Sequence, residues 1–260
     1  MASPLLFAHR GASLELPENT LPAFRLGLEL GASFLETDVH VTRDGHPVLA
    51  HDPSGRRMAG EDAWIRDLPL ARVKRWDAGR NFVDPAGKRP FEGKGFCIPT
   101  LEEALAEFPE ARFNIDLKPR SIPDAAAVLR VLGRAGASRR VRLASFHSAI
   151  IRYVRGEGYP GGTSLGSSEC AWLALAPEPL LRPYPPGTAA QIPTRLGPVA
   201  ADSPAFLDRC HRLGLQVHFW TINEPGEARR LLALGADGIM TDDPRKVGPA
   251  VLSWHQEHYR

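Results

Sequence analysis

Short apolar segments alternate with segments of helical periodicity along most of the chain. Residues 34–41, FLETDVHV, have the two-residue period of a strand, whereas residues 19–31, NTLPAFRLGLELG, place apolar side chains at helical spacing and end at a glycine. Similar pairs recur up to the last helical segment, 247–258, and give about eight strand–helix units in 260 residues. This count predicts an α/β fold, a (β/α)8 barrel of the TIM type.

The main alternative to the barrel is a doubly wound open sheet. Such a sheet normally carries a glycine-rich phosphate loop after its first strand. The corresponding segment of this chain, HRGASLELPENT, lacks that fingerprint, so we favour the barrel.

One interval, residues 53–98, interrupts the alternation of strands and helices. It separates the second strand from its helix, is rich in Gly, Pro, Asp and Arg, and far exceeds the usual connection of a few residues. We therefore expect a single barrel domain over residues 1–260, with a small insertion at about 53–98 folded over the C-terminal rim. A Pro-rich stretch, APEPLLRPYPPGT (176–188), predicts an irregular excursion between strands five and six.

The strand at 34–41 carries polar side chains on one face. Successive strand residues point to opposite faces, so Glu36, Asp38 and His40 share a side. Catalytic groups of such barrels lie at the C-terminal ends of the strands. We expect Glu36 and Asp38 to face the lumen near its mouth, with the apolar face packed against the surrounding helices. His40 points in the same direction. We expect it at most to contact the residues that form the site, and not the substrate or the metal. The segment HPVLAHD is expected to extend this strand after the Asp-Gly turn.

A third carboxylate is expected in the same lumen. Asp116 lies on the strand RFNIDLK, and Lys118 shares its face. Three carboxylates facing one lumen repel one another unless a cation lies among them. Hard oxygen ligands in this number suit Mg²⁺ or Ca²⁺, and Lys118 balances charge or binds an anion.

Other strand ends and helix starts carry ionisable or aromatic side chains, each with a structural alternative. The set comprises His9, Arg10, His51, Asp52, His147, His218, Trp220, Asp242 and Asp243. We interpret Asp242 and Asp243, before Pro244, as caps of the last helix or of a turn. For His147 the alternative to a role in the site is a helix N-terminus. For His218 and Trp220 the alternative is that they only line the barrel.

The motif PENT precedes the first helix. Glu18 and Asn19 either reach back into the site or form the entry of that helix, and we favour the second interpretation, with Asn19 or Thr20 as the N-cap. We interpret Glu18 as a partner of Arg10 behind the site.

Composition narrows the possible partners and compartment. A net charge of +2 with scattered basic residues gives no reason to expect nucleic-acid binding. The three cysteines are far apart and have no metal-like spacing, which favours free thiols in a reducing compartment. The N-terminus does not have the pattern of a signal peptide, and no stretch approaches transmembrane length. We expect a soluble, cytoplasmic protein. The sequence does not indicate its oligomeric state.

Six motifs together resemble the glycerophosphodiester phosphodiesterases. In chain order they are HRGASLELPENTLPAF, GASFLETDVHVTRDGHPVLAHD, TLEEAL, NIDLK, WTIN and GADGIMTDDP. Their order and spacing match the family from Phe7 to about Pro244. The resemblance implies a (β/α)8 barrel enzyme, a phosphoric diester hydrolase. It would convert small-molecule glycerophosphodiesters to glycerol 3-phosphate and an alcohol, with a divalent metal and histidine acid/base catalysis.

The resemblance also assigns roles by position. It implies one divalent cation, Mg²⁺ or Ca²⁺, held by Glu36, Asp38 and Asp116. His9 and His51 take the acid and base positions, although both could instead pack structurally at loop starts. Arg10 and Lys118 would contact phosphate. Apart from the resemblance, we expect Trp220 either to pack against the glycerol or its substituent or only to line the barrel. The chain departs from the family at Asp116, where Glu is more common.

Two other functions remain open at this stage. The first is a lysophospholipase D-like or phosphoinositide phospholipase-like diesterase, which acts on lipids and would need an apolar lip at the barrel mouth. Four aromatic residues of the insertion could supply that lip or form the insertion's own core: Trp64, Trp76, Phe82 and Phe91. The second is a barrel that binds a phosphodiester without catalysis.

Overall fold

A computed structural model of the chain describes residues 3–177, 180, 187–197 and 199–258. Most of the Pro-rich stretch 176–188, predicted to form an irregular excursion, lies outside these described residues. Within the described ranges, no helix combines the length and apolar character needed to cross a membrane.

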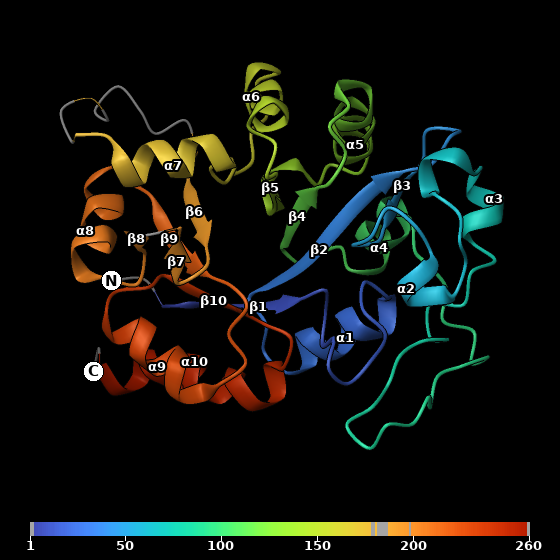
Figure 1. The fold of residues 1–260 in the computed structure, drawn as a ribbon, viewed down its shortest axis with the longest axis horizontal. Helices are drawn as coiled ribbons and strands as arrows, with labels where there is room; N and C mark the ends of the chain where they lie inside the picture. Colours follow the sequence, from blue (N-terminus) through green and yellow to red (C-terminus); the bar gives the residue numbers. More distant parts are fainter. Residues whose placement is uncertain (1–2, 178–179, 181–186, 198, 259–260) are drawn as a thin grey trace.

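Parallel strands form the centre of the molecule (Figure 1). Seven of them pair in the order β5-β4-β2-β1-β10-β9-β6. Their bounds are β1 (Leu5–His9), β2 (Phe34–Val41), β4 (Phe113–Leu117), β5 (Val141–Ala144), β6 (Ala189–Ile192), β9 (Gln216–Phe219) and β10 (Gly238–Thr241). Thr163 and Ser164 form parallel bridges to β5 and β6 and so occupy the eighth strand position. The predicted (β/α)8 barrel is confirmed.

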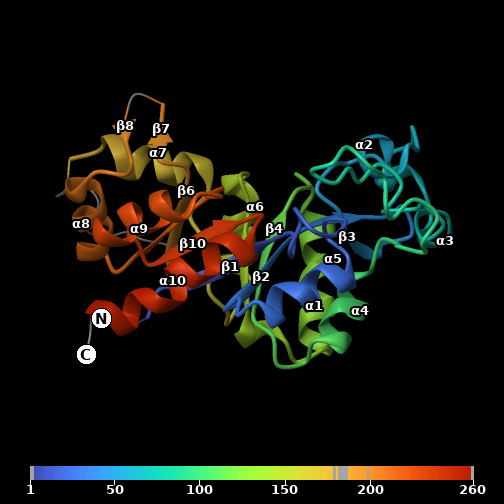
Figure 2. The same cartoon turned by 90° about the horizontal axis from the view of Figure 1, so that it is seen from below.

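Helices cover the outside of the barrel (Figures 1 and 2). They are α1 (Leu21–Glu29), α4 (Leu101–Glu107), α5 (Ile122–Arg134), α6 (Ser148–Gly156), α7 (Ser167–Leu175), α8 (Pro204–Arg212), α9 (Pro225–Ala233) and α10 (Pro244–His258). Several begin at side-chain caps, as their sequences predict. The Thr20 hydroxyl accepts the Ala23 amide, and Thr100 with Glu103 forms a capping box. The helix α7 was not predicted.

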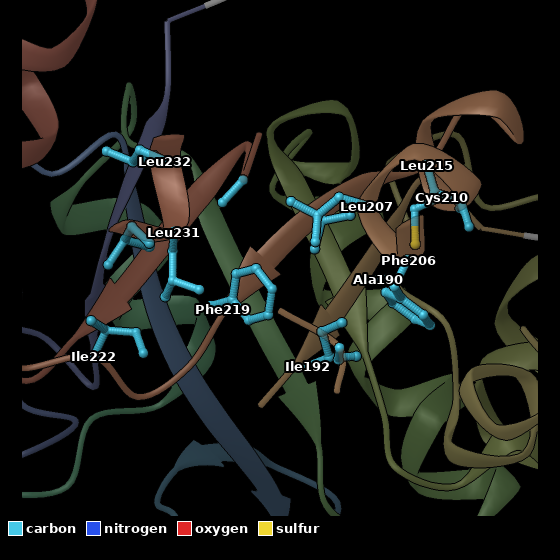
Figure 3. Close-up of a cluster of buried hydrophobic side chains, with 14 of the residues drawn as sticks. Ala190, Ile192, Phe206, Leu207, Cys210, Leu215, Phe219, Ile222, Leu231 and Leu232 are labelled. Carbon is cyan, nitrogen blue, oxygen red and sulfur yellow. The ribbon is translucent and has the colours of Figure 1, made fainter. Parts of the chain in front are cut away.

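The core lies between the strands and these helices and has two large parts. One part joins β6, β9 and β10 to α8, α9 and α10, and Figure 3 shows Phe219 between Leu207 and Leu231 there. The other part joins β2, β4 and β5 to α1, α4 and α5. Leu35 and Val39 are fully buried in this second part. The apolar face of β2 therefore packs against helices, and its polar face is left for the lumen.

The segment after β2 corrects one expectation. β3 (Pro47–Leu49) pairs antiparallel with β2 instead of extending it. The Asp44-Gly45 turn reverses the chain, with Gly45 in the left-handed region at φ 85°. The Ala50 amide consequently donates to the Asp38 carbonyl at 3.0 Å. This reversal returns His51 to the neighbourhood of Asp38.

Residues 53–98 carry short helices and form a hydrophobic cluster together with Val48 and Ala50. The helices are α2 (Arg56–Ala59), η1 (Ile65–Asp67) and α3 (Leu70–Val73). Trp76 is buried in the cluster, and Phe82 and Phe91 pack with ring centroids 5.1 Å apart. Trp64 is half-exposed and lies under Arg66. These aromatic residues thus serve mainly the segment's own packing rather than an apolar lip.

Candidate active site

The eight residues proposed for the site from sequence all line one cavity at the barrel mouth. The cavity has a volume of about 170 Å³. The eight residues are His9, Arg10, Glu36, Asp38, His51, Asp116, Lys118 and Trp220. They lie in or directly after β1, β2, β4 and β9, and His51 follows β3. The ends of these strands therefore bring them together.

The loop after β1 adopts a backbone that few residues tolerate. Arg10 has φ 57° and Gly11 has φ 83°. A Cβ at Gly11 would lie 2.6 Å from the Ala23 carbonyl carbon, so only glycine fits. The Arg10 amide donates to Glu36 Oε2 at 3.1 Å. Such left-handed backbone at non-glycine residues costs free energy and persists where surrounding contacts impose it.

The PENT motif contributes more than a helix start. Thr20 is the N-cap, whereas Asn19 is buried with φ 56° and reaches the site. Its Nδ2 donates to Asp38 Oδ2 at 3.1 Å, and its Oδ1 accepts from Thr37 Oγ1 at 2.6 Å. Asn19 therefore reaches back into the site, which is the interpretation of the PENT motif that we did not favour from the sequence. Glu18 does pair with Arg10, at 3.3 Å, as predicted.

Buried carboxylates and two cations meet below this loop. Glu36, Asp38 and Asp116 are all buried. Lys118 Nζ lies 2.8 Å from Asp38 Oδ1 and 2.7 Å from Asp116 Oδ2. Arg10 Nε lies 3.3 Å from Asp38 Oδ2. Asp38 therefore contacts both Arg10 and Lys118, while Glu36 accepts the Arg10 amide and lies 3.8 Å from His9 Nε2.

The pKa directions follow this distribution of charge. Burial, together with the charge of Asp38, raises the pKa of Glu36 to about 7. Burial also raises the pKa of Asp116, with Asp38 adding to the effect and Lys118 opposing it. Burial acts the same way on Asp38, but Lys118 and Arg10 outweigh it and lower its pKa. The negative charge of the three carboxylates, when all are ionised, thus exceeds the positive charge of Arg10 and Lys118.

These carboxylates suit a hard divalent cation by their chemistry. Asp116 Oδ1 is buried and has no hydrogen-bond partner in the described part of the chain, an arrangement that an added cation would satisfy. Among the described residues, no three Asp, Glu, His or Cys side chains are grouped as a complete metal site. Lys118 lies between two of the carboxylates and supplies part of the positive charge.

Each of the two site histidines forms a short hydrogen bond to a carboxylate. His9 Nδ1 lies 2.6 Å from Asp242 Oδ1, and His51 Nδ1 lies 2.7 Å from Asp52 Oδ1. Burial opposes ionisation of both carboxyls, but their hydrogen bonds outweigh it and lower the pKa of Asp242 and of Asp52. An ionised carboxylate only accepts, so each Nδ1 carries the proton. Each Nε2 is left to exchange a proton with a bound molecule.

Asp242 corrects its sequence interpretation as a helix cap. The cap of α10 is Asp243, whose Oδ1 accepts the Lys246 amide at 2.9 Å. Asp242 instead orients His9, because Ala8 pairs with Thr241 and the next residue on each strand is therefore a neighbour. The predicted strand order contained a signal for the contact between Asp242 and His9, because closing a barrel places the last strand beside the first.

Arg57 is a further residue that sequence reasoning missed. It comes from α2 and bonds Glu18 through two nitrogens, at 2.6 and 2.8 Å. Its Nε also donates to Asp52 Oδ2 at 2.5 Å. A chain of ion pairs therefore links Arg10, Glu18, Arg57 and Asp52 to His51. The insertion thereby holds the partner of a site histidine.

We expect Arg57→Ala to lower kcat about tenfold, as loss of an outer partner of a functional group commonly does. Without Arg57, the pKa of Asp52 rises and His51 loses a fixed orientation. The pH profile of kcat should shift, with little change in melting temperature. Arg56→Ala is the matched control, because the Arg56 side chain pairs with the exposed Asp62, away from the site. Equal kinetics in the two variants would contradict the role of Arg57.

A polar layer lies in the barrel beneath the site. His218 is fully buried, and its Nδ1 is 3.3 Å from both Arg142 Nη1 and Gln191 Nε2. Gln191 also donates to Asn114 Oδ1 at 2.7 Å. Burial, and secondly the charge of Arg142, lowers the pKa of His218 well below its usual value. His218 is thus a barrel-lining residue, one of its two sequence interpretations.

This lowered pKa predicts a pH-dependent stability. The unfolded chain binds a proton at His218 below about pH 6.5 and the folded chain does not. The contribution of His218 is therefore present above pH 6.5 and is lost as the pH falls below it, by about 1.4 kcal/mol per pH unit. Urea unfolding at several pH values between 5 and 7.5 measures this slope. His218→Gln should flatten the slope by that amount, and an unchanged slope would exclude the effect.

Comparisons with known proteins agree on one family. Residues 9–246 match the model of the glycerophosphoryl diester phosphodiesterase family. A probable glycerophosphodiester phosphodiesterase 2 of Mycobacterium tuberculosis is 33% identical, covering 92% of this chain and 87% of the relative. A lysophospholipase D of Homo sapiens is 27% identical over 92% of this chain and 83% of its own length. A phosphodiesterase of Oleispira antarctica, solved in complex with the product sn-glycerol-3-phosphate, is 26% identical. Its TM-score is 0.81, with 96% of this chain and 97% of that chain covered.

Proposed function

The chain belongs to the glycerophosphoryl diester phosphodiesterase family, and on this premise we propose that it hydrolyses glycerophosphodiesters to glycerol 3-phosphate and an alcohol. It is a phosphoric diester hydrolase by that membership. The observation that carries the proposal is the pairing of two oriented histidines with three buried carboxylates and two cations in one cavity. A barrel that only binds a phosphodiester would have no need for two oriented imidazoles.

Arg10 and Lys118 bind the phosphate in this proposal. A phosphodiester carries one negative charge and gains more as it becomes pentacoordinate. Fixed cations directed at that charge stabilise the transition state. Both side chains are already held by carboxylates, Arg10 by Glu18 and Asp38, and Lys118 by Asp38 and Asp116. Their positions are therefore set before the substrate arrives.

His9 and His51 carry the proton transfers. One imidazole removes a proton from the nucleophile, and the other protonates the leaving alkoxide, which is otherwise a poor leaving group. The nucleophile is water or the glycerol 2-hydroxyl, which would give a cyclic phosphate first. Histidine suits both tasks because its ordinary pKa is about 6.5. The Asp partners fix each ring with Nε2 available.

Glu36, Asp38 and Asp116 hold one divalent cation, Mg²⁺ or Ca²⁺, in this proposal. When bound, the cation supplies Lewis-acid stabilisation of phosphate oxygens. Support comes from the raised pKa of Glu36 and from the unpartnered oxygen of Asp116. Asp116 is one methylene shorter than the family's more common Glu, and Lys118 occupies part of the space beside it.

The domain and compartment assignments are proposals too. We treat residues 1–260 as one barrel domain with an insertion at about 53–98. Support comes from the hydrophobic cluster that this segment forms with Val48 and Ala50, apart from the two large parts of the core. Free thiols at Cys97, Cys170 and Cys210 support a reducing compartment, and we propose the cytoplasm.

The test identifies which phosphorus–oxygen bond breaks. Purified protein with Mg²⁺ or Ca²⁺ is incubated with glycerophosphocholine, glycerophosphoethanolamine and glycerophosphoserine, and both products are quantified. The proposal expects glycerol 3-phosphate and the free alcohol in equal amounts from at least one of them. Release of glycerol and a phosphorylated headgroup, or no turnover of any substrate with either metal, would overturn it.

A further inference from the structure

Three neighbouring strands end side by side at the barrel mouth. The sheet order places β9 next to β10 and β10 next to β1. His9 ends β1, Asp242 directly follows β10, and Asn223 lies in the loop after β9. The three side chains therefore form a row across the strand ends, with the site histidine at one end and Asn223 at the other. Asn223 is not among the residues that line the active-site cavity.

The orientation of the His9 ring depends on Asp242. His9 Nδ1 lies 2.6 Å from Asp242 Oδ1. On the opposite side of the ring, Nε2 lies 3.8 Å from Glu36 Oε2, which is too long for a hydrogen bond. The Asp242 side chain is 26% exposed, so water competes for its oxygens. Any group that holds the Asp242 carboxylate consequently holds His9 as well.

Two side chains donate to the Asp242 carboxylate, and they differ in how fully they are committed to it. Ser13 Oγ lies 3.1 Å from Asp242 Oδ1 but only 2.8 Å from the His9 carbonyl oxygen. A hydroxyl has one proton, so Ser13 divides that proton between two acceptors. Asn223 Nδ2 donates at 2.9 Å to Oδ2, the carboxylate oxygen that His9 does not use. Asn223 is therefore the stronger restraint on the carboxylate.

The partners of Asn223 determine which way its side-chain amide points. Its Oδ1 accepts from Thr241 Oγ1 at 3.0 Å and from the Asp242 backbone amide at 2.9 Å. A backbone amide only donates, so this end of the side chain is the oxygen and the nitrogen faces Asp242 Oδ2. The loop is fixed too, because Ile222 is buried and its amide donates to the Met240 carbonyl at 2.9 Å.

The two histidine–carboxylate pairs of the site are held by donors of different kinds. Asp52, the partner of His51, accepts from the cation Arg57. Asp242 accepts from the neutral amide of Asn223. Asn223 thus takes for its pair the place that Arg57 takes for the other. Replacing Asn223 by a neutral residue changes the hydrogen bonding of Asp242 without removing a charge, so its effect reports orientation.

We propose that Asn223 is a positioning residue of the active site: through Asp242 it holds His9 with Nδ1 protonated and Nε2 free to exchange a proton with the substrate. The inference rests on the proposed role of His9 in proton transfer and adds a residue from outside the cavity to it. The structural alternative is that Asn223 only ties the loop after β9 to the end of β10.

Substitutions at the two ends of this tie separate the alternatives. Asn223→Asp keeps an acceptor for Thr241 and for the Asp242 amide but replaces the donor that faces Oδ2 by an oxygen. Thr241→Val removes one bond of the tie and leaves the bond from Asn223 to the carboxylate intact. We expect Asn223→Asp and Asn223→Ala to lower kcat for glycerophosphocholine about 10- to 100-fold with little change in KM. Thr241→Val, the matched control, should keep kcat near the wild-type value.

A double variant shows whether the effect passes through His9. Residues that act as a unit are non-additive in their effects on kcat. Asn223→Ala added to His9→Ala should therefore cause no further loss, because the ring that Asn223 orients is already absent.

Nitrogen-15 NMR of the histidine rings tests the geometry without turnover. The hydrogen bond of each ring sets which nitrogen carries the proton, and the spectrum distinguishes the two tautomers. Above the pKa of both rings, His9 and His51 should each show the single Nδ1–H tautomer in the wild type, with signals identified by their loss in the alanine variants. In Asn223→Asp the His9 ring should become a mixture of tautomers. The His51 ring, bonded to Asp52, should stay unchanged and is the internal control.

The outcomes separate this inference from the proposed function. Wild-type kcat in Asn223→Asp, an unchanged His9 tautomer in that variant, or an equal loss of kcat in Thr241→Val would each overturn the assignment of Asn223. So would a further loss when Asn223→Ala is added to His9→Ala. A wild-type protein without turnover overturns the diesterase proposal instead, and the ring tautomers then still decide whether Asn223 orients His9.

Discussion

His9→Ala and His51→Ala should each lower kcat by about 10²- to 10⁴-fold, the range that general acid or base catalysis supplies. Each change removes one of the two Nε2 atoms in the cavity. The loss should appear in kcat/KM as well, because proton transfer is needed in the transition state and not for binding. Steady-state release of glycerol 3-phosphate measures the effect.

Both variants should fold with a melting temperature close to that of the wild type. In His9→Ala, Asp242 keeps its hydrogen bonds from Ser13 at 3.1 Å and from Asn223 at 2.9 Å. His51 is partly exposed. His147→Ala is the matched control, since His147 is the N-cap residue of α6 and is absent from the cavity lining. Substantial activity in either site variant, or an equal loss in His147→Ala, would contradict the assignment.

Glu36→Gln and Asp116→Asn should abolish stabilisation by Mg²⁺ or Ca²⁺ and reduce turnover by a comparable or larger factor than the histidine changes. A cation at 100 times its dissociation constant stabilises the folded wild type by about 2.7 kcal/mol. Each variant removes one ionised oxygen donor, so the shift in melting temperature on adding metal should largely disappear. Differential scanning fluorimetry with metal and with EDTA measures the shift independently of activity.

The same variants should be at least as stable as the wild type in EDTA. The raised pKa of Glu36 and of Asp116 shows that burial disfavours both charges, and a neutral amide removes that cost. In Glu36→Gln the amide oxygen still accepts the Arg10 N–H. Asp208→Asn, at an exposed position on α8, is the matched control. A full metal-induced shift in both site variants would exclude these carboxylates as ligands.

Local patterns in the sequence predicted most of the barrel. Period-two alternation in β2 separates Leu35 and Val39 from Glu36 and Asp38, and the structure buries the first pair against helices. Capping residues such as Thr20 and Thr100 marked helix starts, because a cap acts over three residues. The alternation and the caps both depend only on residues that are close together in the chain, so the sequence alone reveals them.

Contacts between distant segments could not be read in the same way. Asp242 meets His9 only because the last strand closes beside the first. Arg57 reaches Glu18 and Asp52 from a segment whose fold has no simple period. The direction of β3 depended on the turn at Gly45, which reverses the chain.

The central claim is that the cavity holding His9, His51 and the three carboxylates hydrolyses glycerophosphodiesters with a bound divalent cation. One measurement tests it most directly: ³¹P NMR of glycerophosphocholine incubated with the purified protein, first with Mg²⁺ or Ca²⁺, then with EDTA, then with metal restored. The diester signal should convert to that of glycerol 3-phosphate, stop converting in EDTA, and resume when metal returns. A diester signal that persists throughout, or that converts equally fast in EDTA, would contradict the account.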